Sequence, residues 1–176
     1  MNVPGLGEVT KDQRFEWHYS EPLTLSIFNG MDCRVVLEGY DDDSEKEDFH
    51  LAIANLLSAP PSALKAAERF IYQYYLDIFN YYGELEDAFP RIETAASIWS
   101  HVQLGDEPIV SRRHDGDRGI YVSLECNCDW EPEHGLQIVF RNGNEISKVG
   151  PYDGHLTNSD AFDDATLEGV VYRPIA

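Results

Sequence analysis

The sequence predicts an α+β fold in which antiparallel β hairpins at both ends of the chain flank a central helical segment. Apolar residues alternate with polar ones over residues 1–40 and again after Pro108, which is typical of half-buried strands. Between these regions they recur every three or four residues, which is typical of amphipathic helices. Because the helices lie between two β regions and do not alternate with strands, the layout is α+β.

The N-terminal β region is expected to contain a hairpin. Residues 5–9 begin it, and apolar side chains then alternate along residues 15–19 and 23–27 up to Asn29-Gly30. This dipeptide is preferred in two-residue hairpin turns because both of its residues accept a positive φ. The return strand is predicted over residues 32–39.

The central segment is predicted to hold three helices. Ser44 and Glu47 have the spacing of a capping box, so the first helix is expected over residues 45–58. Two consecutive prolines end it and open the strongest helix, which is predicted over residues 61–82 because its apolar face recurs at helical spacing throughout. A shorter helix is expected over residues 93–101.

The C-terminal β region carries a second hairpin signal at Asn142-Gly143. The strands predicted in this region cover residues 109–113, 119–128, 135–141 and 145–149. After them, residues 150–167 are expected to form a polar loop, and residues 168–172 to form a last edge strand.

Length and charge restrict the classes of function. The chain has 176 residues, which predicts a single domain over residues 1–176. It carries 32 acidic and 13 basic residues, so its formal charge is -19. Nucleic acids and anionic membranes bind clustered Lys and Arg, so neither is an expected partner. The same charge would accelerate encounter with a basic protein, or simply keep the chain soluble.

Cysteine usage and the N-terminal residues predict a cytoplasmic location. The three cysteines are an odd number without framework spacing, and the N-terminus lacks the basic and apolar regions of a signal peptide. Motifs for hydrolases, metalloproteases and phosphate-binding loops are absent from the sequence, so no cofactor and no catalytic residue is expected. The oligomeric state is left open.

Residues 125–135 concentrate the side chains that a binding site would use. The candidate binding residues are Trp130, Glu131, Glu133 and His134 of this segment, together with Asp153 and His155. If the two loops meet, they would bring an acid and a base together. The competing interpretation is that Glu133 and His134 only close the turn before a strand, and this interpretation is favoured.

Cys126 and Cys128 allow two interpretations. Their spacing places them on one face of a strand, and His134 follows six residues later. A zinc site needs four tetrahedral ligands, and the paired two-residue knuckles of closed zinc sites are absent. Two inward-facing core cysteines are therefore favoured over a metal site.

The same region carries a resemblance to a family. The run from Cys126 to Gly143, followed by residues 149–158 and 167–169, resembles the C-terminal signature of a family of uncharacterised bacterial domains. The opening residues 4–10 are similar to that family's start, so the resemblance covers most of the chain. It implies a small bacterial accessory protein, comparable to members found in settings like those of toxin-immunity genes. It implies no catalytic residues.

The favoured function is a non-enzymatic domain that binds another protein, in the manner of an immunity protein that neutralises a basic toxin. An exposed Trp130 would anchor the partner. Acidic side chains would steer a basic partner toward the domain. The acids expected to do so include Asp41, Asp42, Asp43, Glu84, Glu86 and Asp87.

Two further functions remain open. One is a small-ligand or metal-binding domain, with or without enzymatic activity, at the edge of the sheet. Its site would be built from Trp130, Glu133, His134, Asp153 and His155. The other is a structural or regulatory module that associates with itself.

Overall fold

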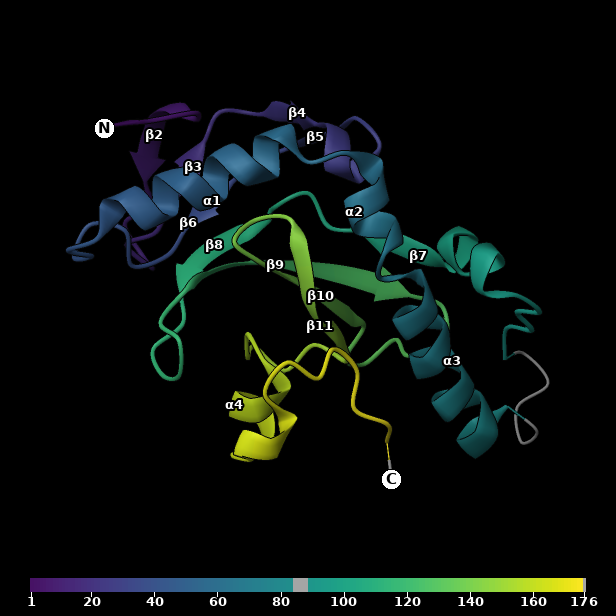
Figure 1. Ribbon diagram of the computed structural model, residues 1–176. Coiled ribbons are helices and arrows are strands. Elements are labelled where there is room, and N and C mark those ends of the chain that lie inside the picture. Colours follow the sequence, from purple (N-terminus) through teal and green to yellow (C-terminus); the bar gives the residue numbers. More distant parts are fainter. Residues whose placement is uncertain (84–88, 176) are drawn as a thin grey trace.

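The computed structural model describes residues 1–83 and 89–175 and confirms the α+β fold (Figure 1). Within these residues, nine strands form one sheet in which β7 pairs with β9 beside the main order β1-β2-β3-β6-β8-β9-β10-β11, and β4 and β5 form a separate pair. The strands are β1 (Asn2–Val3), β2 (Gly7–Lys11), β3 (His18–Ser20), β4 (Leu23–Leu25), β5 (Met31–Cys33), β6 (Val36–Leu37), β7 (Val102–Leu104), β8 (Ile109–Arg112), β9 (Ile120–Cys128), β10 (Leu136–Arg141) and β11 (Glu145–Gly150).

The two β regions are joined into one sheet. The pairs within each region are antiparallel, as predicted, but β6 pairs with β8 in parallel. This parallel pair was not predicted, because it joins two short strands through a long crossover. The crossover here contains the whole helical segment.

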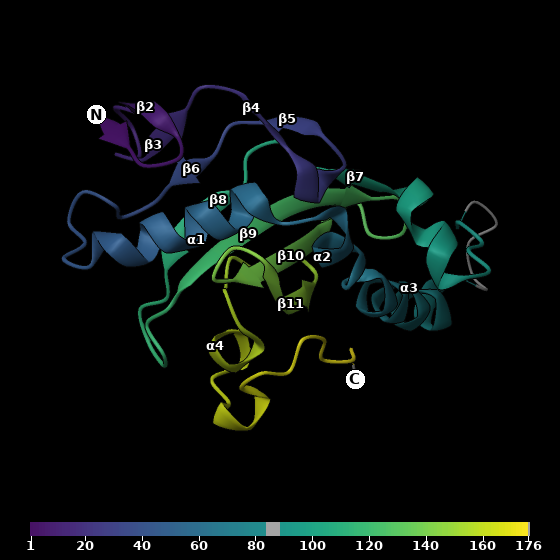
Figure 2. The same ribbon diagram turned by 45° about the horizontal axis from the view of Figure 1, so that its top comes forward.

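The helices cover one face of the sheet. They are α1 (Lys46–Ser58), α2 (Pro61–Lys65) and α3 (Glu68–Tyr82), with short 3₁₀ helices η1 (Ser26–Phe28) and η2 (Ala95–His101) beside them. The C-terminal segment, with α4 (Asn158–Phe162) and η3 (Ala165–Leu167), lies on the opposite face (Figure 2). Among the described residues, no helix has the length and apolar character needed to cross a membrane.

Alternation along the strands gives the sheet one apolar face and one polar face. On β9, Val122, Leu124, Cys126 and Cys128 are buried in the core with α1 and α3, as the predicted alternation requires. The opposite face carries Ser123 on β9 and its neighbours Gln137 on β10 and Lys148 on β11, which are also buried. The sheet is therefore apolar toward the helices and polar toward the C-terminal segment.

Several predicted elements differ from the structure. The first helix has no capping box: it begins after Glu45, and no side chain caps it. The strand expected over residues 15–19 is reduced to β3, because Phe15 is half exposed and its ring contacts only its sequence neighbours Arg14 and Trp17 among the aromatic and cation–π pairs of the described residues. The long helix is divided into α2 and α3 by a turn at residues 66–67.

The end of the chain also differs from the prediction. The expected polar loop contains α4, which is capped by the Thr157 side chain, and η3. The expected strand over residues 168–172 is absent. A single backbone hydrogen bond, from Val149 N–H to the Val171 carbonyl (2.8 Å), holds that stretch beside β11.

Both predicted hairpin turns have the expected positive φ, but neither is the two-residue turn that was predicted. Residues 26–30, which include η1, join β4 to β5, and residues 142–144 join β10 to β11. Asn29 and Gly30 adopt φ of 57° and 79°, and Asn142 and Gly143 adopt 50° and 87°. The second turn also docks on α1, since the Asn55 amide donates to the Asn142 carbonyl at 2.9 Å. A Cβ at Gly143 would lie 2.1 Å from the Ala52 carbonyl oxygen, so only glycine fits this contact.

We therefore expect Gly143→Ala to lower the free energy of unfolding by about 1–3 kcal/mol, because it adds a backbone clash to the strain of a positive φ. Gly169→Ala is the matched control, since Gly169 has a φ of 74° and open space around it. Urea unfolding of both variants measures the difference. Equal losses of stability would show that the turn does not need its close approach to α1.

Candidate functional site

The loop of residues 151–156 lies between two hollows. The larger, called the polar cleft, has a volume of about 1150 Å³ and extends from the start of α1 past the β8–β9 loop to His155. The smaller, called the aromatic hollow, has a volume of about 400 Å³ and lies between the end of α3, the turn before β10 and Ile175. Tyr152 lines both.

A chain of buried polar side chains runs beneath the loop. The Gln137 amide donates to the Ser123 hydroxyl at 2.9 Å, and the Lys148 ammonium donates to the Gln137 carbonyl oxygen at 2.9 Å. Lys148 also donates to the Asp153 carboxylate and to the His155 carbonyl. Burial lowers the pKa of Lys148, while the hydrogen bond to Asp153 opposes that shift. The ammonium thus ties the loop to the floor of the sheet.

Two adjacent arginines hold segments on opposite faces of the sheet. Arg112 points toward the helical side, where it donates to Asp43 at 2.5 and 3.0 Å and to Asp48 at 2.9 Å. These bonds fix the start of α1, and they lower the pKa of Asp43. Consecutive residues of an extended chain point to opposite faces, which explains why neighbouring arginines serve different segments.

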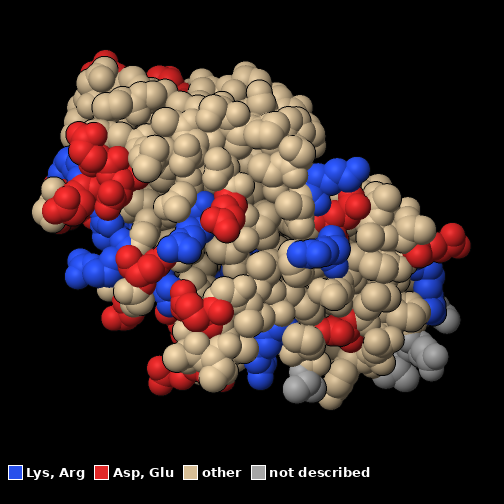
Figure 3. Space-filling view, viewed as in Figure 1, with Lys and Arg blue, Asp and Glu red and all other residues tan. Residues whose placement is uncertain are grey.

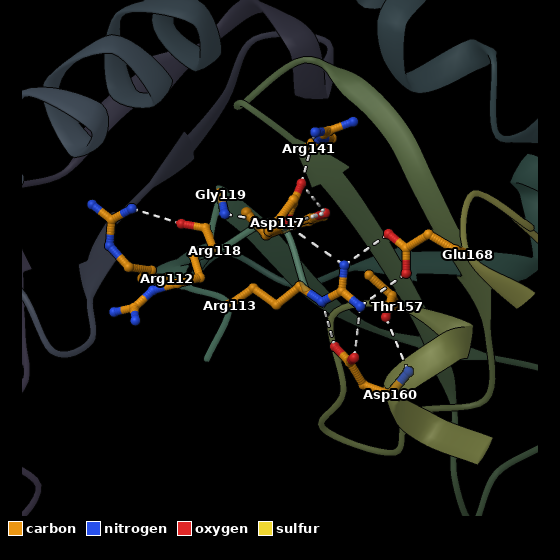
Figure 4. Close-up of polar contacts among 10 residues, drawn as sticks. Arg112, Arg113, Asp117, Arg118, Gly119, Arg141, Thr157, Asp160 and Glu168 are labelled. Atoms are coloured by element: carbon orange, nitrogen blue, oxygen red, sulfur yellow. Dashed lines mark hydrogen bonds and ion pairs between the residues drawn. The ribbon is translucent and has the colours of Figure 1, made fainter. Parts of the chain in front are cut away.

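Arg113 fixes the C-terminal segment (Figure 4). Its guanidinium donates to both oxygens of Asp160, at 2.8 and 2.7 Å, and to both oxygens of Glu168, at 2.8 and 2.9 Å. Asp117 lies on a third side, 3.6 Å away, and binds Arg141 at 2.7 Å. The Arg113 side chain is 3% exposed, so these paired hydrogen bonds lie away from solvent. They hold the C-terminal segment against the polar face of the sheet.

The aromatic hollow is negatively charged. Its walls include Tyr74, Tyr81, Tyr82 and Tyr152, and the carboxylates of Asp77, Glu131 and Asp153. No Lys or Arg lines it among the described residues. Tyr81 and Tyr82 are 67% and 47% exposed, with ring centroids 5.3 Å apart, and Ile175 is exposed beside them.

Each of the three carboxylates of the aromatic hollow accepts hydrogen bonds through only one of its two oxygens. One oxygen of Asp77 accepts from the Tyr172 hydroxyl at 2.5 Å and from the Ile175 amide. One oxygen of Glu131 accepts from the amides of Glu133 and His134. Asp153 likewise receives Lys148 on a single oxygen. Within residues 1–83 and 89–175, the second oxygen of each carboxylate has no hydrogen-bond donor, so three acceptors remain for a ligand.

The two predicted loops do meet, since the Tyr152 amide donates to the His134 carbonyl at 3.2 Å. Glu131, His134 and Asp153 line the aromatic hollow. His155 instead lines the polar cleft, so the expected site around His134 and His155 is divided between two hollows. Glu133 lies beside Glu131 and His134 at the surface.

The prediction that Trp130 is an exposed anchor is wrong. Its side chain is 2% exposed and packs edge-on against the rings of Tyr74 and Tyr75, each with a centroid distance of 5.9 Å. Its indole N–H has no hydrogen-bond partner among the described residues. A tryptophan in a polar stretch suggests exposure, but α3 supplies a pocket of tyrosine rings that the local sequence does not indicate.

The cysteines are core residues, as favoured. Cys126 and Cys128 are buried. In the part of the chain that the structure describes, neither thiol lies close enough to the His134 ring to share a metal ion with it. The group that does is Glu131, Glu133 and His134, whose ligand atoms all lie within 4.8 Å of one another.

We expect the three thiols to be unreactive in the folded protein. Burial raises the pKa of Cys126 and of Cys128 to about 12 and that of Cys33 to about 11, so thiolate is scarce at neutral pH. A colorimetric thiol assay at pH 8 should detect none in the native state and all three after unfolding in guanidinium. Rapid labelling of one thiol in the native state would contradict this burial.

Acidic side chains gather at the N-terminal end of α1 (Figure 3). Of the acids expected to steer a partner, Asp43 is bound by Arg112 and Asp41 by Lys11, whereas Asp42 has no ion-pair partner among the described residues. The acids expected at positions 84, 86 and 87 lie outside the described residues.

Sequence reasoning missed the polar floor of the cleft and the tyrosine pair at the end of α3. A signal for the floor existed at Gln137, which interrupts the otherwise apolar run of residues 136–140. A tyrosine-rich groove on the helix predicted over residues 61–82 is disfavoured by the sequence relative to core packing. Tyr74 and Tyr75 do pack in the core, whereas Tyr81 and Tyr82 are exposed.

Comparisons with known proteins give one match. Residues 5–156 match the family model described as Domain of unknown function (DUF6985). No curated protein and no solved structure matches the chain.

Proposed function

The chain belongs to the DUF6985 family, and we propose that it is a non-enzymatic protein-binding domain that captures a basic partner in the aromatic hollow. The observation that carries the proposal is the exposed pair Tyr81 and Tyr82 beside the carboxylates of Asp77 and Glu131, which have no Lys or Arg ion-pair partner among the described residues. The third carboxylate, Asp153, is paired with the buried Lys148. Aromatic faces and carboxylates together favour an ammonium or guanidinium group.

The partner we propose is a protein with a Lys or Arg side chain at the centre of its contact surface. That side chain would enter the hollow between Tyr82 and Glu131, while Tyr81 and Ile175 pack against the apolar surface around it. The formal charge of -19 would accelerate the encounter. An immunity protein that neutralises a basic toxin would use both features in this way.

The test begins with affinity capture from the host at low salt and identification of any basic protein retained at a one-to-one ratio. Its dissociation constant is then measured for the wild type and for Tyr81→Ala, Tyr82→Ala and Asp77→Asn. We expect the two tyrosine variants each to weaken binding by about tenfold or more, as hot-spot aromatics do. A rising salt concentration should change the association rate more than the dissociation rate.

Phe15→Ala is the matched control, since Phe15 is 52% exposed and lies outside the hollow. It should leave the dissociation constant unchanged. If Phe15→Ala and Tyr81→Ala weaken binding equally, the hollow is not the contact site. Failure to capture any basic protein at low salt would reject the proposed class of partner. A captured partner whose association rate does not change with salt would reject it as well.

A second candidate function rests on the group formed by Glu131, Glu133 and His134, whose close ligand atoms could hold a divalent cation at the rim of the hollow. Zinc titration by calorimetry tests it. Stoichiometric binding that His134→Ala abolishes would support the metal site. Binding that persists in His134→Ala would be non-specific attraction to the acidic surface.

A further inference from the structure

We propose that the polar cleft is a separate site for a small linear organic polyamine. The site is distinct from the aromatic hollow and does not depend on the function proposed for it. Two independent observations support it: the Ser111 hydroxyl on the cleft floor, which has no hydrogen-bond partner among the described residues, and an excess of negative charge around the rim of the cleft.

The floor of the cleft is polar although it is almost fully buried. Ser111 and Ser123 are each 7% exposed, and Gln137 is 1% exposed. All three line the cleft. A buried polar surface is costly unless its groups are hydrogen-bonded, so each group on this floor needs a partner.

One of these groups lacks one. The Ser111 hydroxyl makes no side-chain hydrogen bond with any described residue, yet the residue is more than nine-tenths buried and lines the cleft. The Ser123 hydroxyl, in contrast, already accepts from Gln137. Ser111 therefore offers an acceptor to an ammonium N–H of a ligand.

The rim supplies the charge. Eight carboxylates and three arginines line the cleft, so its net charge is -5 with the histidines neutral. The guanidinium nitrogens of Arg112 and Arg113 are already bound to carboxylates. Glu38, Asp42 and Asp115 have no ion-pair partner among the described residues. A cleft of this charge repels phosphate and carboxylate ligands and attracts cations.

Size and chemistry favour a polyamine over a metal ion. A volume of about 1150 Å³ is that of a small-molecule site, far larger than a single ion requires. The unpaired carboxylates come from separate elements, the end of β6, the loop before α1 and the β8–β9 loop. A flexible chain with several ammonium groups can reach these carboxylates at once while one ammonium donates to Ser111.

The probe for the test is spermidine, a linear triamine, titrated into the full chain at about 150 mM salt by calorimetry. We expect saturable one-to-one binding that Ser111→Ala weakens by about three- to tenfold, the effect of one hydrogen bond. The double variant E38Q/D42N should weaken binding by about five- to tenfold through the loss of two attractive charges. Amide shifts of residues 111 and 123 should follow the titration in NMR spectra.

Three controls make the result decisive. Glu145→Gln removes an exposed acid outside the cleft and should bind as the wild type does. Butylamine, with one charge, should bind far more weakly than spermidine. Magnesium chloride at equal ionic strength should not displace spermidine. If magnesium competes as well as a polyamine, or if Ser111→Ala and Glu145→Gln behave alike, the polyamine is only screening the acidic surface and the site does not exist.

Discussion

Arg113→Ala is expected to lower the free energy of unfolding by about 3 kcal/mol and to release the C-terminal segment from the sheet. The substitution removes four charge-assisted hydrogen bonds to Asp160 and Glu168. It also leaves these two carboxylates without the Arg113 cation, whose side chain is 3% exposed. Because both acids are partly exposed, water compensates some of the loss, and the expected value lies at the lower end of the range for buried ion pairs.

The measurement combines urea unfolding with hydrogen exchange. Exchange should accelerate selectively over residues 157–172, while amides of α1 and α3 keep their protection. Arg34→Ala is the matched control, because Arg34 and Glu107 form an exposed pair at 3.5 Å and such pairs contribute about 0–1 kcal/mol. Uniform acceleration across the chain would show that Arg113 supports the whole fold and not one segment.

The bonds from Arg113 to Asp160 and Glu168 also predict that the stability of the fold decreases in acid. The Arg113 hydrogen bonds lower the pKa of Glu168, and they outweigh the effect of burial so that the pKa of Asp160 is also lowered. A carboxyl whose pKa is lower in the folded state stabilises the fold above its unfolded pKa of about 4 and loses this effect as pH falls. Stability should therefore fall below about pH 4, and less steeply in Arg113→Ala.

The positions of the two hairpin turns and their positive φ values were predicted correctly because turn chemistry is local, although the loops are longer than two residues. Asn142-Gly143 specifies positive φ wherever the chain places it. The alternation of β9 was likewise sufficient to place Cys126 and Cys128 on the buried face. These features depend on residues within a few positions of one another, which is the information that a single sequence contains.

The polar side of the sheet depends on contacts that a single sequence does not contain. Arg112 meets Asp43 across 69 positions, and Arg113 meets Asp160 across 47. Gln137 and Lys148 have the pattern of solvent-facing strand residues, and they are buried only because the C-terminal segment returns over them. Trp130 was placed at the surface for the same reason, since its tyrosine neighbours come from α3.

Lys148→Met should produce the largest loss of stability, about 3–5 kcal/mol, because its ammonium is 1% exposed and joins three acceptors. Methionine preserves most of the side-chain volume, so the effect measures the lost charge and hydrogen bonds rather than a cavity. Without the ammonium, the Gln137 carbonyl oxygen is buried without a partner and the loop of residues 151–156 loses its attachment. Unfolding in urea, monitored by tryptophan fluorescence, provides the measurement.

Two further variants separate the possible causes of that loss. Lys11→Met removes a lysine from an exposed ion pair with Asp41 and should cost less than about 1 kcal/mol. The double variant Lys148→Met with Asp153→Leu removes both charges, so it should recover part of the stability lost by Lys148→Met alone. If the double variant is instead as unstable as the sum of its single variants, Lys148 stabilises the loop through Gln137 and the His155 carbonyl, and its pairing with Asp153 contributes little.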